Sequence, residues 1–515
     1  MIRLQSYLAG HWQDGAGSGA QLKDPVSGEI LATASGDGLD MAGALAFARD
    51  RGGQALRALT FAQRAGLINA LAGVLAENRE RYNSIALANS GNTAVDAALD
   101  VDGGIGTLKY YASIGRKLGE AHLLAEATDD QLTKDEAFRG RHIWTTLHGV
   151  AVHINAFNFP SWGLWEKAAV SLLAGMPFLA KPATATAWLA HEMVRDVVAA
   201  GVLPDGAISL LCGGGRDLMD HLRPGDLVAF TGSADTAEHL RSNPNVIRSN
   251  IRFAVEADSL NLCVLGPDAS PDSPEFAAFI KEVSREMTVK AGQKCTAIRR
   301  VLVPRDRVDA VVTALKAALA KAVMGDPRTE GVRMGPLVSR AQAQAAWAGL
   351  DRLKAETRVA AGGGNDDGGC FVPPTLLLCN DPMAARLVHE IEVFGPVATL
   401  MPYDGVDQAV ALARKGGGSL AASVFSGDGA FLAGFVPAIA TSHGRVLVVD
   451  GSVAAGHSGH GVVMPHCVHG GPGRAGGGEE LGGLRGLRFY MQRSAVQGSR
   501  TMLDAMTQGA AVVAL

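Results

Sequence analysis

The amino-acid sequence predicts an α/β protein with two parallel sheets, each covered by helices, and a protruding arm. Between His148 and Val255, apolar runs alternate with segments of helical period, which is typical of a parallel sheet packed against helices. A second alternating region begins near Leu260. A charged stretch of low periodicity, 120–141, interrupts the first region, and we expect the carboxy-terminal segment to pair with it. The 515 residues exceed what one hydrophobic core can hold.

The apolar runs give the strands, and the segments of helical period give the helices. In the first region, strands are predicted over 149–154, 178–181, 207–212, 227–231 and 251–255. Helices are predicted between them, over 162–173, 187–200, 216–222 and 234–241. In the second region we predict a helix over 275–291, a strand over 300–303 and a long helix over 308–323.

The composition excludes several classes of protein. The charged fraction is 19%, the apolar fraction 47% and the formal net charge -4, so no basic excess favours nucleic acid as a partner. The amino-terminal residues contain no continuous apolar segment, and no later run reaches the roughly 18 apolar residues of a membrane span. We therefore expect a cytoplasmic protein with no nucleic-acid or membrane partner.

The six cysteines include no CxxC pair, which argues against a disulfide scaffold or a structural zinc module. Cys295 differs from the others because it lies between a predicted helix and a predicted strand, close in sequence to Lys294, Arg299 and Arg300. Nearby positive charge favours the thiolate, which is the nucleophilic form. Most isolated cysteines are buried structural thiols, so a catalytic role depends on the surrounding motifs.

Two patterns near the carboxy-terminus resemble functional motifs but do not predict a site. Five potential metal ligands fall close together: His457, His460, His466, Cys467 and His469. Because flexible glycines separate them, a preorganised tetrahedral site is disfavoured and we expect no metal. The GxGxxG match at Gly471, Gly473 and Gly476 is rejected as a nucleotide fingerprint, since no strand runs into it and no helix follows.

Six short segments, in order along the chain, carry a family resemblance. They are NAFNFP at 155–160, KPA at 181–183, FTGS at 230–233, VEADSLN at 255–261, GQKCTA at 292–297 and EIEVFGPV at 390–397. The ordered set resembles the aldehyde dehydrogenase superfamily. YLAGHW, DPVSGEIL and TLKYYASIGRKLG extend this resemblance over essentially the whole chain.

The resemblance implies a covalent oxidation of an aldehyde. Cys295 would attack the aldehyde carbon, and the side-chain amide of Asn158 with the backbone N–H of Cys295 would stabilise the resulting oxyanion. Glu256 would activate the water that hydrolyses the thioester. Lys167 matches a supporting lysine near the oxyanion site, and Glu480 matches a second carboxylate at the water site.

The expected cofactor is a nicotinamide dinucleotide. Thr231, Gly232 and Ser233 end a predicted strand and open a helix, where backbone N–H groups and the helix dipole can bind a pyrophosphate. By resemblance, four further residues bind the cofactor: Lys181 and the adjoining Ala183 at the adenosine ribose, Glu392 at the nicotinamide ribose and Phe394 at the ring.

The residue three positions after Lys181 bears on the choice between NAD and NADP. NAD-preferring relatives often have an acid there, whereas this chain has Thr184. A carboxylate would repel a 2′-phosphate by up to ~4 kcal/mol at an effective dielectric of about 20. Since Thr184 and Thr186 offer hydroxyl donors instead, NADP is favoured and NAD stays possible. The alternative is that Thr184 only caps the next helix.

The resemblance also implies a division into domains. We expect an aldehyde dehydrogenase-like fold with two Rossmann-like parallel-sheet domains and a small β oligomerisation arm. The NAD(P)-binding domain would comprise 1–122 and 146–257, the catalytic domain 258–470, and the arm and tail 123–145 and 484–515. A homodimer is expected, with a tetramer as the alternative.

Two segments depart from the commonest family pattern, VEADSLN and HGGPGRAGGGEELGG. Both resemble the branch that oxidises CoA-linked semialdehydes in aerobic aromatic degradation, and we expect a stand-alone enzyme of that branch. One rival is a CoA-acylating dehydrogenase, which the retained Glu256 disfavours because a thiol acceptor needs no activated water. The other is a non-catalytic NADP-binding protein on the same scaffold.

Overall fold

The computed structural model describes residues 2–514. Its first large sheet has seven strands in the order β12-β11-β8-β9-β10-β2-β3. Five of them are parallel: β8 (Ala151–Ile154), β9 (Phe178–Lys181), β10 (Ile208–Leu210), β11 (Leu227–Thr231) and β12 (Arg252–Glu256). The antiparallel edge strands are β2 (Ser6–Leu8) and β3 (His11–Gln13). All five predicted strands of this region are confirmed.

Helices cover the first sheet, which explains the continuous apolar runs of its strands. They are α6 (Trp162–Ala174), α7 (Ala187–Ala199), α8 (Ala234–Arg241) and α9 (Pro244–Arg248). A long helix, α5 (Ala94–Leu118), packs on α6 and on α3 (Phe61–Glu77). Further amino-terminal elements are α1 (Met41–Phe47), α2 (Gly53–Arg57), α4 (Arg79–Ser90) and the small sheet of β1 (Ile2–Leu4), β5 (Ile30–Ala34) and β4 (Ala20–Lys23).

The second large sheet also has seven strands, in the order β15-β16-β17-β14-β13-β18-β19. They are β13 (Leu262–Leu265), β14 (Arg300–Pro304), β15 (Arg358–Ala361), β16 (Thr375–Leu378), β17 (Val397–Tyr403), β18 (Ser419–Phe425) and β19 (His443–Val449). All pairs are parallel except β15 with β16. The helices are α10 (Pro274–Thr288), α11 (Val308–Leu319), α12 (Arg340–Leu353), α13 (Gly405–Arg414) and α14 (Gly429–Ala440).

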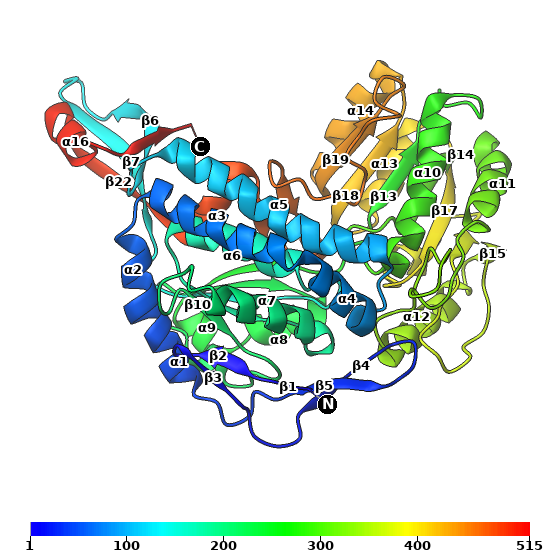
Figure 1. The fold of residues 1–515 in the computed structure, drawn as a ribbon. Helices are drawn as coiled ribbons and strands as arrows, with labels where there is room; N and C mark the ends of the chain where they lie inside the picture. The colour runs from blue at the N-terminus through cyan, green and yellow to red at the C-terminus, as the bar shows by residue number, and fades with distance from the viewer. Residues whose placement is uncertain (1, 515) are drawn as a thin grey trace.

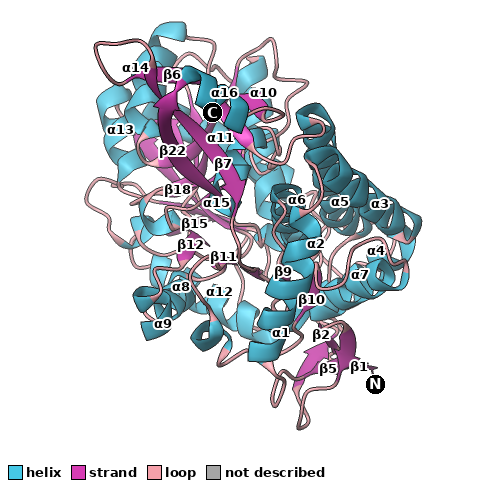
Figure 2. Ribbon diagram, turned by 90° about the vertical axis from the view of Figure 1, so that its left-hand side faces the viewer, coloured by secondary structure: helices cyan, strands magenta, loops and turns pink. Residues whose placement is uncertain are grey.

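An antiparallel arm extends from the first body (Figures 1 and 2). It contains β6 (Leu124–Gln131), β7 (Phe138–Thr146), β22 (Met491–Ser499) and β23 (Ala511–Val513), with α16 (Arg500–Met506) beside them. β22 pairs with β7 from Met491 opposite Thr146 to Ser499 opposite Phe138. The predicted pairing of the carboxy-terminal segment with the interrupting stretch is confirmed.

Three predicted helices are wrong in detail. The long helix predicted over 308–323 ends at Leu319. The segment 216–222 forms only a 3-10 turn, Leu218–His221, because extended Leu222 and then Pro224 follow. The helix predicted over 275–291 ends at Thr288. Lys290 and Ala291 adopt left-handed φ angles of 53° and 52°, which a continuing α-helix does not accommodate.

No single helix among residues 2–514 is long and apolar enough to cross a membrane. One pair reaches that length and composition together, Met41–Arg57 with Phe61–Glu77, but it is bent by 116°. Leu56, Phe61 and Ile68 from this pair are buried in the hydrophobic core that α5 and α6 share.

Candidate active site

Cys295 lies where two cavities meet, immediately before β14. The smaller one, called the short cavity, has a volume of about 40 Å³, and the larger one, called the long cavity, about 800 Å³. Thr231 and Glu256 line both, from the carboxyl ends of the neighbouring parallel strands β11 and β12. Asn158, in the loop after β8, also lines both. Ligands of open α/β sheets bind at this edge.

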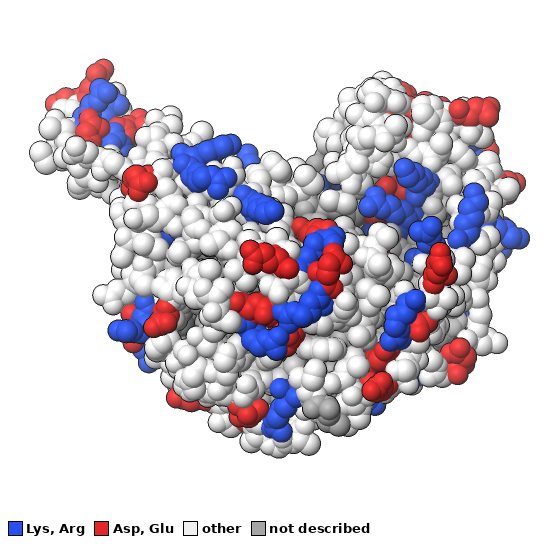
Figure 3. Space-filling view, viewed as in Figure 1, with Lys and Arg blue, Asp and Glu red and all other residues white. Residues whose placement is uncertain are grey.

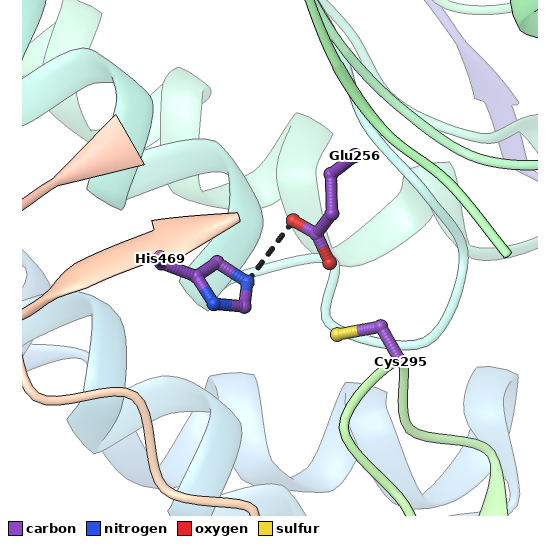
Figure 4. Close-up of side chains that lie close together, drawn as sticks. All are labelled: Glu256, Cys295 and His469. Atoms are coloured by element: carbon purple, nitrogen blue, oxygen red, sulfur yellow. Dashed lines mark ion pairs between the residues drawn. The ribbon is translucent and has the colours of Figure 1, made fainter. Parts of the chain in front are cut away.

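Glu256 stands between the sulfur of Cys295 and the imidazole of His469 (Figure 4). One carboxylate oxygen faces each partner. Nε2 of His469 lies 3.1 Å from Oε2 of Glu256, and ligand-type atoms of all three residues lie within 4.8 Å of one another. The carboxylate oxygen Oε1 of Glu256 is buried without a hydrogen-bond partner. A nucleophile and a carboxylate base are therefore in direct reach of one another.

The electrostatics of this cluster differ from the prediction. Burial raises the pKa of the Cys295 thiol well above its usual range, and the negative charge of Glu256 raises it further. For Glu256 itself, burial acts to raise the pKa, but His469 and then Lys167 lower it to about 2. The resting pair is a protonated thiol beside a carboxylate.

The basic residues near Cys295 in sequence hydrogen-bond to groups other than its sulfur. Lys294 donates a hydrogen bond of 2.6 Å to Glu286. Arg299 donates to the carbonyl of Gly395, and buried Arg300 donates to the carbonyl of Leu412. The predicted activation of Cys295 by these three side chains is therefore wrong. Residues next to each other in sequence turn to different faces once the chain enters a strand.

The surroundings of the sulfur include two residues that sequence reasoning missed. Asn155 lines both cavities, and neither polar atom of its buried side chain has a hydrogen-bond partner. Glu166 lines the short cavity, and burial raises its pKa to about 7. Asn155 is the first residue of the NAFNFP segment, and Glu166 directly precedes Lys167. Their positions in the sequence, within or next to residues predicted for the site, could have identified both.

Lys167 and Glu480 form a pair behind the reacting atoms. Nζ of Lys167 donates to Oε2 of Glu480 at 3.0 Å and to Oγ1 of Thr231 at 2.9 Å. Both line a smaller cavity with Glu166, away from Cys295. Glu480 does not line either cavity that contains Cys295, so the structure does not bring it to the sulfur.

The long cavity is lined by almost all residues predicted to bind the cofactor. They are Lys181, Ala183, Thr231, Gly232, Ser233, Glu392 and Phe394. A Cβ atom at Gly232 would lie 2.5 Å from the ring of Phe230, so this turn excludes larger residues. Oε1 of Glu392 is buried without a hydrogen bond, and a ribose hydroxyl could supply that donor. The residues present fit a nicotinamide dinucleotide.

Thr184 and Thr186, which were predicted to donate hydrogen bonds to a 2′-phosphate, have different surroundings. Thr184 opens the 3-10 turn Thr184–Thr186 and does not line the cavity. Thr186 is fully buried, and its hydroxyl donates a hydrogen bond of 3.0 Å to the carbonyl of Phe157. The hydroxyl of Thr186 is thus not free to bind phosphate, and that part of the prediction is wrong.

The five potential metal ligands near the carboxy-terminus have separate surroundings. His460 is buried against the hydroxyl of Ser423, 2.9 Å away. The ring of His466 packs on Tyr110, and the side chain of Cys467 is exposed. His469 alone lines the short cavity, together with Gly461 and Val463 of the same loop.

The sequence as a whole matches a known family. Residues 12–496 match the model of the aldehyde dehydrogenase family. The chain belongs to the aldehyde dehydrogenase family. Its match spans both large sheets and the arm, so this aldehyde dehydrogenase carries the fold and the enzyme class of the family, NAD(P)-dependent oxidation of aldehydes.

Relatives of this aldehyde dehydrogenase include a 3,4-dehydroadipyl-CoA semialdehyde dehydrogenase of Aromatoleum evansii. It is 55% identical over 479 residues, which cover 92% of this chain and 93% of the relative. Protein MaoC of Klebsiella aerogenes is 48% identical over 178 residues, 34% of this chain and 53% of its own length.

Solved structures support the fold of this aldehyde dehydrogenase. A gamma-glutamyl-gamma-aminobutyraldehyde dehydrogenase from Burkholderia cenocepacia has a TM-score of 0.84 at 24% identity, covering 97% of each chain. A betaine aldehyde dehydrogenase mutant from Staphylococcus aureus in complex with NAD+ has a TM-score of 0.80 at 22% identity, covering 97% of this chain and 98% of that one.

Proposed function

We propose that this aldehyde dehydrogenase oxidises 3,4-dehydroadipyl-CoA semialdehyde to the carboxylic acid, with NADP+ as the acceptor and a covalent Cys295 thioester as intermediate. The observation that carries the chemistry is the Cys295 thiol at the meeting point of two cavities, with its sulfur within 4.8 Å of a carboxylate oxygen of Glu256. The substrate rests on the name of the relative that is 55% identical over 92% of the chain.

In the first half-reaction the sulfur of Cys295 forms a bond to the aldehyde carbon, and the thiol proton leaves. That proton passes to solvent, which leaves Glu256 ionised for the second half-reaction. The carbonyl oxygen gains negative charge, and we assign its stabilisation to the Asn158 amide and the Cys295 backbone N–H, two residues that line the short cavity. When bound, the nicotinamide takes up the hydride that the carbon loses, and a thioester remains on Cys295.

In the second half-reaction Glu256 removes a proton from water as the water oxygen bonds to the thioester carbon. The carbon–sulfur bond breaks, the acid leaves, and the proton that Glu256 took from water passes to the Cys295 sulfur. Glu256 is suited to this step because its pKa of about 2 keeps it ionised at neutral pH.

The preference for NADP rests on Thr184, which replaces the acid that NAD-binding relatives often carry three residues after the lysine. Thr184 is half-exposed at the start of its 3-10 turn, where no carboxylate would oppose a 2′-phosphate. Lys181 and Ala183, which precede Thr184 in the sequence, line the long cavity. We propose the domain ranges given above and a homodimer for the whole enzyme.

A single kinetic experiment tests this function. Purified enzyme is mixed with the CoA-linked semialdehyde and either NADP+ or NAD+, and absorbance of the reduced cofactor is followed from the first milliseconds. We expect turnover that is faster with NADP+ and absent in Cys295→Ala. Glu256→Gln should give one burst of reduced cofactor per active site and then stall. Normal steady turnover by Glu256→Gln would contradict the role of Glu256.

The product distinguishes the hydrolytic reaction from a CoA-acylating one. If free CoA rather than water attacked the thioester, the new product would be an acyl-CoA at the oxidised carbon, and the rate would depend on added CoA. The buried, ionised Glu256 beside the sulfur favours water as the acceptor. Mass spectrometry of the product without added CoA should therefore find the free carboxylate.

A further inference from the structure

His469 contacts Glu256, but the mechanism above assigns it no role. It lies on β20 (Val468–Gly470), which pairs with β21 (Glu479–Leu481). The side chains of His469 and Glu256 are 5% and 6% exposed, and their closest atoms are 3.1 Å apart. The imidazole binds the carboxylate oxygen that turns away from the sulfur (Figure 4).

The backbone beneath His469 has little freedom to move. A Cβ atom at Gly444 on β19 would lie 1.8 Å from the carbonyl oxygen of Gly470. A Cβ atom at Gly476 would lie 2.3 Å from the carbonyl oxygen of Val255, the residue before Glu256. The segment that carries His469 is therefore packed against the strand that carries Glu256, and the two side chains face each other across a fixed gap.

Several charged groups surround this pair. Lys167 and Glu166 face it from α6, and Arg445 faces His469 from β19. Burial opposes the charged form of His469, yet the adjacent Glu256 raises its pKa above the ordinary value. Burial likewise opposes the charged form of Glu256, and His469 is the largest influence that lowers its pKa. Each side chain thus stabilises the ionised form of the other.

We propose that His469 is a positioning residue for Glu256, which fixes one carboxylate oxygen so that the other faces the Cys295 thioester and which keeps the carboxylate ionised. Without this partner, a carboxylate buried to this degree favours its protonated form and can rotate. It then no longer accepts a proton from water. This inference rests on the proposed function of Glu256.

Two variants separate the hydrogen bond from the charge. His469→Gln keeps an N–H donor at a similar distance but carries no charge, whereas His469→Leu removes both. The acid limb of the kcat profile reports ionisation of Glu256, because kcat is lost as pH falls through the pKa of that carboxylate. With the charge removed, this pKa rises, and the limb should move to higher pH by about one to three units.

The two variants should also differ from one another at neutral pH. His469→Gln should retain much of kcat, since the carboxylate keeps its orientation, and His469→Leu should lose more. Both should retain the full burst of reduced cofactor, because deacylation is the affected step. His460→Gln is the matched control, since it removes another buried imidazole of the same loop that contacts Ser423 rather than Glu256.

The inference would be overturned if the acid limb of the kcat profile did not move in His469→Gln. It would also be overturned if the burst of reduced cofactor shrank in proportion to kcat, because that result indicates only that fewer sites are folded. If His469→Leu fails to fold, the position of the acid limb in the kcat profile of His469→Gln tests the inference alone. Failure of the proposed function itself is distinct, because it would appear as steady turnover in Glu256→Gln.

A separate observation concerns the surface of α5. Three basic residues, Lys109, Arg116 and Lys117, are exposed on this helix. None of the three forms an ion pair or a side-chain hydrogen bond with any residue in 2–514. We call them the α5 basic stripe. Figure 3 shows Lys and Arg side chains following the line of α5. Basic side chains held together without partners form a site for anionic groups.

The α5 basic stripe begins beside the short cavity. Trp162 lines that cavity and packs on α5, where a Cβ atom at Gly103 would lie 2.1 Å from its ring. The ring of Tyr110, next to Lys109, lies 4.1 Å from that of His466 in the loop that also lines the cavity. From Gly106, which borders open space, α5 runs about 16 Å to Lys117.

We infer that the α5 basic stripe binds the phosphates of the CoA moiety carried by the substrate. The aldehyde end must reach Cys295, so the CoA end extends out of the short cavity onto neighbouring surface. The diphosphate and 3′-phosphate of CoA are multiply charged, and lysine and arginine are their usual partners. This inference deepens the proposed function by placing the distal part of its substrate.

The test compares a CoA-linked substrate with a free aldehyde. Lys109→Glu with Arg116→Glu should raise KM for 3,4-dehydroadipyl-CoA semialdehyde several-fold and leave KM for hexanal unchanged, with the difference shrinking at high salt. The control reverses two exposed charges elsewhere, Lys316→Glu with Lys321→Glu, on and just after α11. It changes the net charge equally and should alter neither KM.

Equal KM values for the CoA-linked substrate in the stripe variant, the control and the wild type would overturn this placement. A parallel rise of KM for hexanal would do the same, since it indicates a disturbed cavity. If the wild type oxidises hexanal but not the CoA-linked semialdehyde, the proposed substrate fails instead, and the stripe has no CoA to bind.

Discussion

At the scale of single residues, Cys295 has surroundings that oppose its ionisation. The carboxylates of Glu256, Glu166 and Glu392 all raise its pKa, and burial raises it most. A thiol in such surroundings is a poor nucleophile at rest. Reactivity therefore has to arise during the catalytic cycle, when the proton passes to a base or positive charge enters the cavity.

Alkylation of the free enzyme tests whether the Cys295 thiol is protonated at rest. Iodoacetamide should modify Cys295 slowly at neutral pH, and Glu256→Gln should speed the reaction several-fold because it removes the negative charge that raises the pKa of the thiol. Peptide mass spectrometry measures the rate, and exposed Cys467 in the same sample is the internal control. Slower alkylation in Glu256→Gln would instead mean that Glu256 deprotonates the thiol in the free enzyme.

Motifs in the sequence located Cys295, Glu256 and Asn158, which the structure places together on one cavity. The sequence did not reveal the contact of His469 with Glu256, because the two residues lie on separate strands and only folding brings them to 3.1 Å. The prediction that Lys294 and Arg300 activate Cys295 was wrong for the opposite reason. These residues are close to Cys295 in sequence, but their side chains hydrogen-bond to Glu286 and to the carbonyl of Leu412.

At the scale of elements, the glycine-rich segment after β20 serves as a close-packed support for β12. Ala257 donates its backbone N–H to the carbonyl of Ala475, and Gly478 donates to the carbonyl of Val255. Gly476 has a φ of 105°, and any Cβ there would collide with the Val255 carbonyl. The glycines thus allow two backbones to touch immediately beside Glu256.

Gly476→Ala should displace Val255 and with it the carboxylate of Glu256. A displacement near 1 Å at a reacting group costs about a hundredfold in rate, so we expect kcat to fall by roughly that factor while the cofactor burst persists. Gly477→Ala is the matched control, because Gly477 also has a positive φ, 74°, but its Cβ would meet nothing within 4 Å. Equal losses in both variants would point to backbone strain alone.

The parallel strands of the first sheet were predictable because each is a short apolar run between helical segments. The end of α10 was not, because helical periodicity continues through Lys290 and Ala291 in the sequence. Tertiary packing imposes their left-handed backbone: a Cβ at the next residue, Gly292, would lie 2.4 Å from the Gly395 carbonyl oxygen. Such constraints come from distant chain and leave no local pattern.

At the scale of the whole molecule, the arm carries apolar side chains that are exposed to solvent in a monomer. Met502 and Met506 on α16 are 56% and 54% exposed, and Val512 on β23 is 70% exposed. Phe138 on β7 adds to them. Apolar groups gathered on a protruding sheet are typical of an oligomer interface, in agreement with the proposed homodimer.

Charged substitutions on the arm should therefore release single chains. We expect Met506→Glu with Val512→Glu to convert the dimer to a monomer, measured by size-exclusion chromatography with light scattering. Ile247→Glu, at a 64% exposed position of α9, is the control and should leave the dimer intact. A wild-type protein that elutes as a monomer would contradict the proposed assembly outright.

The protonated state of the Cys295 sulfur also bears on how the enzyme withstands oxidants. Peroxide attacks thiolates far faster than thiols, so a molecule waiting for its aldehyde keeps its sulfur in the form that survives oxidative stress. During turnover the sulfur is bonded to the substrate carbon, so peroxide would find a thiolate only in the interval between release of the acid and return of the proton to Cys295.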